Sequence, residues 1–320
     1  MRRTSAILVL FLLLPLTGCL WRSHSVKRTA VPVANLREAT RDQLVNSINS
    51  ESAKIQTLNA TVDIAASVGG EKKGKVTDYT DIKGYLLVRE PNMLRMIGLF
   101  PVVRNKAFDM VSDGDRFKLS IPTKNKFVEG SNEVVRHSDN PLENLRPQVI
   151  FNALLLHPID QHDDVAVLEV GMEEVASPKS KTPVHQPDYE LIVSHKGEQG
   201  WYLARKIIFS RTDLLPHRQI IYDLLGNIAT DALYDDFKDY SGTQFPSKID
   251  ISRPQEEYKI VLTIEDLKVN APLKPEQFAL AQPPGAQVVN LDMQSAAALR
   301  ASDGNSSKPD NKQKPKSQMD

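Results

Sequence analysis

Hydrophobic and polar residues follow two different periods along this chain. Across 34–58 the apolar residues recur at near-helical spacing with charged residues between them, which predicts an amphipathic helix. A second helical pattern covers 142–156 and begins directly after Asn140-Pro141. We expect the first of these helices to lie with its apolar face on a sheet.

Most of the remaining chain has the two-residue period of β-strands. Phe117, Leu119 and Ile121 point to one face of a strand, and Asp113-Gly114-Asp115 is the turn that joins this strand to the one before it. Such segments give about eleven strands, joined mostly by hairpins. Twist accumulates in an antiparallel sheet of this size, so it must curl. The pattern predicts a mainly β (α+β) fold with a helix on the concave face. Strand-like segments occur at 62–68, 82–88, 94–99, 107–112, 116–121, 165–171, 188–195, 201–210, 217–224, 228–237, 247–252 and 257–269.

The first residues have the parts of a secretory signal peptide. Two arginines follow Met1, an apolar run covers 6–16, and the sequence Leu16-Thr17-Gly18-Cys19 comes next. The run is too short to span ~30 Å of hydrocarbon. These last four residues resemble the lipobox of bacterial lipoproteins, in which signal peptidase cuts before the cysteine and that cysteine carries the lipid. The alternative is an ordinary secretory signal that contains a cysteine by chance.

Cys19 is the only cysteine in the 320 residues, so it has no partner for an internal disulfide. Two acyl chains anchor a protein stably where one is marginal. Leu20 follows the cysteine where an Asp would direct retention in the inner membrane of enteric bacteria. The resemblance therefore implies the outer membrane, with the protein facing the periplasm, membrane lipid as its anchor, and the lipoprotein export and sorting machinery among its partners.

Charge and composition set the limits of the folded part. Lys and Arg together number 40, as do Asp and Glu, so nothing in the charge balance favours nucleic acid as a partner. The polar segment 293–320 cannot bury enough apolar surface to fold and is expected to be disordered. We expect a signal peptide at 1–18, the lipidated cysteine and a tether at 19–33, one folded domain at 34–292 and a disordered tail at 293–320.

Candidate chemistry is sparse. His157, His162, Asp163 and Asp164 form the one dense group of metal-ligand types, but Pro158 and their spacing favour a solvated loop over a metal site. His217 stands in a strand without a matching nucleophile motif. The sequence contains no nucleophile elbow, zinc-protease motif, phosphate loop or dinucleotide fingerprint. We expect no metal, no cofactor and no catalytic residue, so that an enzyme is the third choice of function.

The order of parts resembles the LolA/LolB/LppX superfamily of periplasmic lipoprotein and lipid carriers. After the lipobox and the first helix come the strand pair Gly-Tyr-Leu-Leu-Val-Arg-Glu-Pro-Asn-Met-Leu-Arg at 84–95 and the hairpin Phe-Asp-Met-Val-Ser-Asp-Gly-Asp-Arg-Phe at 108–117. The motif Pro-Leu-Glu-Asn-Leu-Arg-Pro at 141–147 and a final β run ending in Pro-Leu-Lys-Pro-Glu-Gln-Phe-Ala-Leu at 272–280 follow. The resemblance spans about 35–290 and rests on loose strand and turn patterns.

The resemblance implies an open, incomplete antiparallel β-barrel of about eleven strands, with helices covering its concave face and an apolar cavity for acyl chains. Lipids or lipoproteins would be the cargo. Two alternatives to a carrier remain: an envelope assembly or interaction lipoprotein with a filled core, and an enzyme. For the carrier, the expected cavity residues are Leu44, Ile48, Leu86, Leu119, Ile207 and Ile264, and the expected membrane-contact residues are Leu99 and Phe100, although these two could simply end a buried strand.

Overall fold

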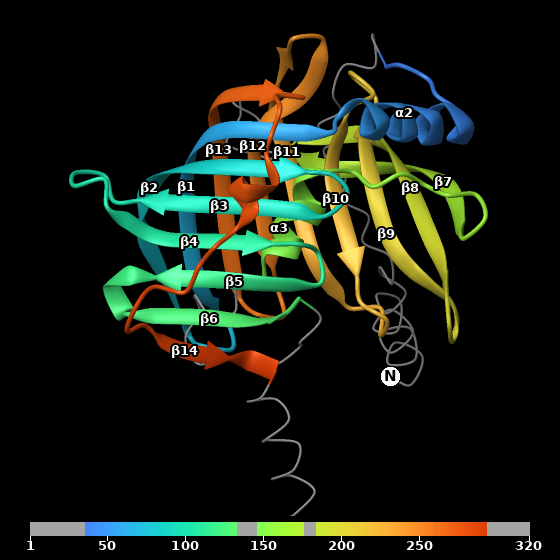
Figure 1. Ribbon diagram of the computed structural model, residues 1–320. Helices are drawn as coiled ribbons and strands as arrows, with labels where there is room; N and C mark the ends of the chain where they lie inside the picture. The colour runs from blue at the N-terminus through green and yellow to red at the C-terminus, as the bar shows by residue number, and fades with distance from the viewer. Residues whose placement is uncertain (1–35, 133–145, 176–183, 293–320) are drawn as a thin grey trace, which may run out of the picture. The chain divides into compact units, whose positions relative to one another are not determined.

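The computed structural model describes residues 36–132, 146–175 and 184–292 (Figure 1). The chain divides into two units, and the unit of 36–172 and 187–320 contains nearly all of the described elements. In the other unit, 1–35 and 173–186, only the adjoining ends of two strands are described. The expected signal peptide, tether and tail lie outside the described residues. The elements and pockets described below belong to the larger unit.

The described elements are two α-helices, two short 3-10 helices and fourteen strands. The helices are α2 (Arg41–Lys54), α3 (Pro147–Leu154), η2 (Pro122–Lys124) and η4 (Pro275–Phe278). The strands are β1 (Thr57–Gly70), β2 (Lys75–Arg89), β3 (Met93–Leu99), β4 (Lys106–Ser112), β5 (Arg116–Ile121), β6 (Lys126–Ser131), β7 (Asp164–Val175), β8 (Val184–Gly197), β9 (Gly200–Ser210), β10 (Pro216–Tyr222), β11 (Ile228–Tyr240), β12 (Thr243–Arg253), β13 (Tyr258–Val269) and β14 (Gln287–Asn290).

All the strands belong to one curled sheet, in the order β14-β6-β5-β4-β3-β2-β1-β13-β12-β11-β10-β9-β8-β7 (Figure 1). The sheet is not closed in the described part of the chain, since β7 and β14 stand at its two edges. A mainly β fold with a large unclosed sheet is what the sequence predicts. The expected number of about eleven strands is wrong, because the sheet has fourteen.

Two of the strands that the sequence pattern misses lie side by side in the sheet. β6 places Phe127 and Val128, which are adjacent in sequence, in buried positions, so a simple alternation does not reveal it. β14 has four residues and pairs in parallel with β6, from Gln287 opposite Lys126 to Asn290 opposite Glu129. A parallel pairing between such distant segments has no local turn signal.

Helix α2 is shorter than the expected 34–58 segment. Thr40 caps it, because the Thr40 side chain accepts from the Gln43 N–H while the Gln43 side chain accepts from the Thr40 N–H. The helix ends at Ile55, which is extended, and the next apolar residue of the pattern, Leu58, is already in β1. The second helix, α3, begins with Pro147 at its first position. The expected start at 142 lies outside the described residues. No helix of the described ranges is long and apolar enough to cross a membrane.

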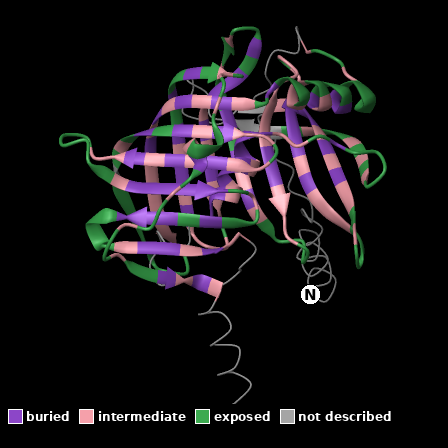
Figure 2. Cartoon of the chain, in the orientation of Figure 1, coloured by how far each residue is buried: buried purple, intermediate pink, exposed green. Residues whose placement is uncertain are grey.

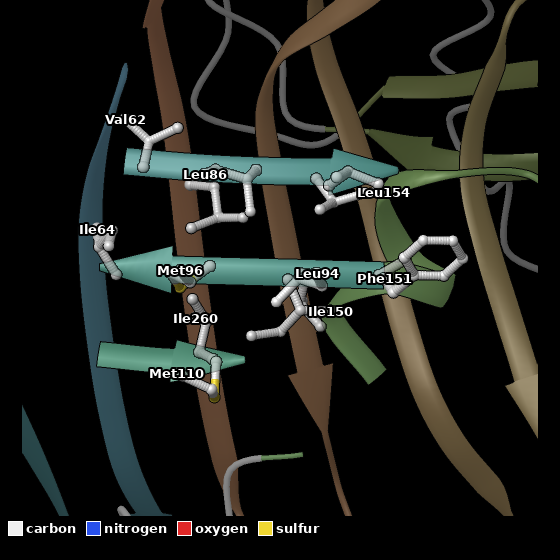
Figure 3. Packing of buried hydrophobic residues seen from close by; sticks show 14 of the residues in the cluster. Val62, Ile64, Leu86, Leu94, Met96, Met110, Ile150, Phe151, Leu154 and Ile260 are labelled. Atoms are coloured by element: carbon white, nitrogen blue, oxygen red, sulfur yellow. The ribbon is translucent and has the colours of Figure 1, made fainter. Parts of the chain in front are cut away.

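The core forms on the inner face of the sheet, where buried and less buried residues alternate along the strands (Figure 2). Phe117, Leu119 and Ile121 of β5 are at most 1% exposed, which confirms their expected common face. Helix α3 contacts β3 and β4 on one side and β11 and β12 on the other. It therefore lies inside the curl of the sheet, with Ile150 and Phe151 beside Leu94 of β3 (Figure 3).

The outer face carries a buried ion pair between β3 and β4. Asp109 is 1% exposed and accepts two hydrogen bonds from Arg95, Nε at 3.0 Å and Nη2 at 2.8 Å, and one from Lys106 at 2.7 Å. Arg95 also donates to the carbonyl of Gln277 in η4, which ties the C-terminal segment to the sheet. Burial alone would raise the pKa of Asp109, but the hydrogen bonds from Arg95 and Lys106 outweigh it and hold the pKa below its usual value.

We predict that Asp109→Asn lowers the free energy of unfolding by about 3 kcal/mol at neutral pH, because it leaves two cations without their buried carboxylate. Since the folded pKa of Asp109 is depressed, its contribution is complete above the pKa of an unfolded Asp, about 4, and is lost as the pH falls through the lower pKa of the folded state. Urea denaturation of both proteins between neutral pH and about pH 3 measures the difference.

The gap in stability between wild type and Asp109→Asn should therefore shrink as the pH falls. A gap that stays constant over this range would show that the charge of Asp109 contributes nothing to folding.

Candidate functional site

An apolar groove of about 360 Å³ opens on the inner face of the sheet, between α3 and the strands β1 to β5 and β13. Its volume lies near the lower end of ligand pockets, which measure about 300–1,000 Å³. We call this pocket the apolar groove. It is lined by Ile64, Ala66, Ser67, Val68, Tyr79, Ile82, Met96, Phe100, Ala107, Phe108, Met110, Ile121, Thr123, Ile150, Tyr258, Lys259 and Ile260.

The strand pattern explains why this groove is apolar. Met96, Met110 and Ile121 occupy inward positions on three successive strands, each at most 1% exposed, and present flexible or branched aliphatic chains to the same space. Gly98 of β3 has no room for a side chain, because a Cβ there would come within 2.5 Å of the Phe108 ring and 2.6 Å of the Ile82 methyl. The missing side chain lets Phe108 and Ile82 pack over β3 at the wall of the groove.

A second, smaller pocket of about 170 Å³ lies between α2, the end of α3 and the strands β9 to β12. We call it the helix pocket. It is comparable to the ~150 Å³ apolar cavity that suffices to bind benzene. Two carboxylates, Glu51 and Glu90, stand at its wall, and burial raises the pKa of Glu90. The other lining residues are Ser47, Ile48, Ser52, Ile55, Leu154, Leu155, Leu156, Phe209, Leu214, Leu215, Pro216, Tyr234, Phe237, Gln244, Phe245 and Pro246.

Helix α3 separates the two pockets and is held in place by polar side chains that point inward from the sheet. The Tyr234 hydroxyl donates to the carbonyl of Ala153 at 2.8 Å. Gln219, 1% exposed, donates to the carbonyl of Asn152 at 3.0 Å and to the Tyr234 oxygen at 3.3 Å. The carbonyls at the end of a helix lack partners within it, so these side chains satisfy groups that water cannot reach.

The loop after α3 is fixed in the same way. Asn49 of α2 donates to the carbonyl of Ile159 at 3.1 Å and accepts from the Ile159 N–H at 2.7 Å. Arg205 of β9 is 9% exposed and donates to the carbonyl of Pro158 at 3.1 Å. Burial lowers the pKa of Arg205, against the opposing effect of Asp164. An amide of α2 and an inward cation of β9 thus hold this loop.

The histidines of the expected loop have structural partners. His157 Nε2 donates to the side-chain oxygen of Asn152 at 3.0 Å, its ring stacks on Phe151, and burial lowers the pKa of His157. His162 is exposed. His217 lies 2.8 Å from Asp213. Over the described residues no group of three or more His, Cys, Asp or Glu side chains is arranged to hold a metal ion.

All six residues expected to line a cavity are buried, four of them in strands and two, Leu44 and Ile48, in helix α2. Leu86, Leu119 and Ile264 belong to the main core cluster and are 0 to 4% exposed, whereas Leu44 and Ile207 belong to a second cluster beneath α2. Only Ile48 of the six lines either of the two pockets described above. Their role as ligand contacts stays a prediction.

The expected membrane-contact residues lie at the end of β3. Leu99 and Phe100 are partly exposed, and Phe100 lines the apolar groove. The turn that follows projects from the sheet (Figure 1) and exposes Val102 at 92% and Val103 at 64%. These two exposed valines were not among the expected contact residues, although the apolar run Phe100-Pro101-Val102-Val103 indicates them in the sequence.

No protein-family model and no curated protein matches the chain. Solved structures do. A DUF1329 family protein from Desulfovibrio piger is 15% identical with a TM-score of 0.45, over 75% of this chain and 95% of that one. A LolA superfamily protein from Nitrosomonas europaea is 12% identical with a TM-score of 0.43, over 74% and 97%. A domain described as an outer membrane lipoprotein-sorting protein from Vibrio parahaemolyticus is 10% identical with a TM-score of 0.42, over 75% and 97%.

The structural neighbours of the chain thus include members of the LolA superfamily, which the order of its sequence motifs resembles. Scores and identities this low transfer no property of those proteins to this chain. What its pockets do has to be argued from their own residues.

We predict that two identical substitutions separate the solid core from the groove. Ile264→Ala should lower the free energy of unfolding by about 3 kcal/mol, because Ile264 is fully packed. Ile82→Ala should cost only about 1 kcal/mol, because Ile82 borders the open groove and loses fewer contacts. Urea denaturation of the two variants provides the comparison. Equal losses would mean that Ile82 is packed as tightly as Ile264 and that the groove is filled.

Proposed function

We propose that this chain is a lipid-anchored protein of the bacterial outer membrane that binds acyl chains or the lipid part of lipoproteins, as a carrier or receptor. The observation that carries the proposal is the apolar groove of about 360 Å³ on the inner face of an unclosed sheet. A pocket lined by methionine, isoleucine and phenylalanine selects for length of hydrocarbon more than for any polar group.

The proposed mechanism is reversible burial of alkyl chain without covalent chemistry or a cofactor. Each CH₂ group transferred from water into the groove contributes about 0.8 kcal/mol, so a chain of ordinary fatty-acid length gains enough to bind. Met96 and Met110 suit this task, because their unbranched side chains adapt to a ligand without loss of packing.

Lipid attached to Cys19 would keep the protein at the membrane, on the periplasmic side. The turn with exposed Val102 and Val103 supports a second contact with lipid, because Phe100 at its base lines the apolar groove. An alkyl chain could pass from the bilayer to the groove along this turn, with Leu99 and Phe100 on its path.

One observation favours a second candidate function, the envelope assembly or interaction lipoprotein, which we call the interaction module. The edge strand β7 exposes Val165 at 49% and Val167 at 51%. Edge strands offer unpaired backbone groups to other chains, and apolar side chains beside them favour such pairing. In that case the groove would have no ligand, and binding of lipid would be absent.

We predict that Ala107→Trp abolishes lipid binding while the protein stays folded. Ala107 lines the groove, and an indole there would occupy much of its volume. The dissociation constant of a fluorescent fatty acid should rise at least about tenfold, which corresponds to about 1.4 kcal/mol. Fluorescence titration of the full chain carrying Cys19→Ser, purified without detergent, provides the measurement.

Ala204→Trp in β9 is the matched control, because this partly buried alanine lies outside both pockets. It should bind the fatty acid as the wild type does. If the wild type binds none, the carrier proposal fails and the interaction module replaces it.

We predict further that Cys19→Ser prevents incorporation of labelled palmitate, because the chain has no other cysteine to acylate. Metabolic labelling followed by fractionation of inner and outer membranes tests both lipidation and location. A substituted protein that still carries the label would rule out the lipoprotein assignment.

A further inference from the structure

A third pocket, which is polar and has a volume of about 370 Å³, adjoins the apolar groove. It lies between the turn that joins β1 to β2 and the turn that joins β12 to β13, and we call it the polar recess. The recess and the groove share Ser67, Tyr258 and Lys259 in their walls. An apolar space and a polar one that meet at shared residues correspond to the two parts of an amphiphile.

Tyr258 stands where the two spaces meet and carries a hydroxyl that the protein itself does not use. Its side chain is 6% exposed and faces inward from β13, and its buried hydroxyl oxygen has no hydrogen-bond partner among the described residues. Burial raises the pKa of Tyr258 to about 12, against the effect of Arg253, so the hydroxyl keeps its proton at any physiological pH. Burying an unpaired hydroxyl costs about 1–3 kcal/mol, and a ligand acceptor that comes within hydrogen-bond distance of the hydroxyl removes that cost.

The neighbouring residue offers the complementary group. Glu257 lines the polar recess, and one of its carboxylate oxygens accepts from the Lys72 N–H at 2.6 Å. That bond fixes the carboxylate against the β1–β2 turn. The other oxygen, Oε2, is buried without a partner and requires a donor.

We infer that the groove and the recess together bind a lipid whose acyl carbonyl accepts a hydrogen bond from Tyr258 and whose next polar group donates one to Glu257. The inference rests on the proposed function, because the acyl chain itself would occupy the apolar groove. A free fatty acid is ionised and lacks the donor. An acyl ester with a free hydroxyl has both the carbonyl and the donor, and so does an acyl amide with its N–H. Monoacylglycerols are lipids of the first kind, and the N-acylated cysteine of lipoproteins is of the second.

Three ligands and two substitutions test the inference on the full chain carrying Cys19→Ser. The ligands are monolauroylglycerol, which has the carbonyl and the donor, methyl laurate, which has only the carbonyl, and the fluorescent probe N-phenylnaphthylamine, which has neither an acyl chain nor a carbonyl. Tyr258→Phe should weaken both esters about five- to tenfold, measured by displacement of the probe. Its affinity for the probe should stay within about twofold.

Glu257→Gln should weaken monolauroylglycerol alone, because glutamine keeps an acceptor for the Lys72 N–H and replaces the free oxygen by a donor. Tyr85→Phe is the matched control, since Tyr85 lies outside both spaces and is 48% exposed, and it should leave all three affinities unchanged. An N-palmitoylated peptide, compared with monolauroylglycerol, then decides between the two sources of the head group.

Tyr258→Phe should also melt at the same temperature as the parent or slightly above it, because it removes a buried hydroxyl that has no partner. A fall of many degrees would reveal a partner in the free protein and overturn the inference. So would unchanged ester affinities in Tyr258→Phe, with the probe still bound. If the parent binds not even the probe, the apolar groove is not a lipid site, and the proposed function fails together with this inference.

Discussion

The rest of the structure depends on one constraint: the backbone carbonyls of a helix inside an apolar concavity need hydrogen-bond donors. A sheet that curls without closing leaves an inner face that something has to cover, and here a short helix, α3, does so (Figure 3). A helix in that place brings carbonyl groups that cannot reach water. Tyr234 and Gln219 supply their donors from the sheet. The polar residues inside this core therefore serve the helix that makes the core possible.

The same arrangement leaves two open spaces in the interior. Hydrogen bonds fix α3 at its C-terminal end, and open space lies on both sides of the helix. Ile150 near its start borders the apolar groove, and Leu154 at its end borders the helix pocket. The loop that follows is held by Asn49 and Arg205, so α2 is part of the same polar framework.

The sequence predicted those features that depend on neighbouring residues. Alternation places Phe117, Leu119 and Ile121 on one face, and an Asp-Gly-Asp turn marks the hairpin before them, so the mainly β fold and most strands could be read locally. The groove could not. Leu119 and Met110 are both inward residues of paired strands, yet only Met110 borders open space, because that depends on which side chains meet it from β1 and β13. Likewise, alternation puts Tyr258 on the inner face, but the lack of a partner for its hydroxyl is a property of the tertiary structure.

The parallel pairing of β14 with β6 has a consequence for how the chain acquires its shape during synthesis. β6 ends at Ser131, whereas its outer neighbour begins only at Gln287, so the intervening residues 132–286, nearly half of the polypeptide, have to be made before that pairing is possible. Until then β6 is an unprotected edge strand whose unpaired amide and carbonyl groups can pair with another chain. A premature stop codon shortly before 287 would leave nearly every hairpin intact and still produce a protein prone to self-association. With β14 in place the sheet ends in a strand of only four residues, and a very short edge strand offers few unpaired backbone groups to another chain.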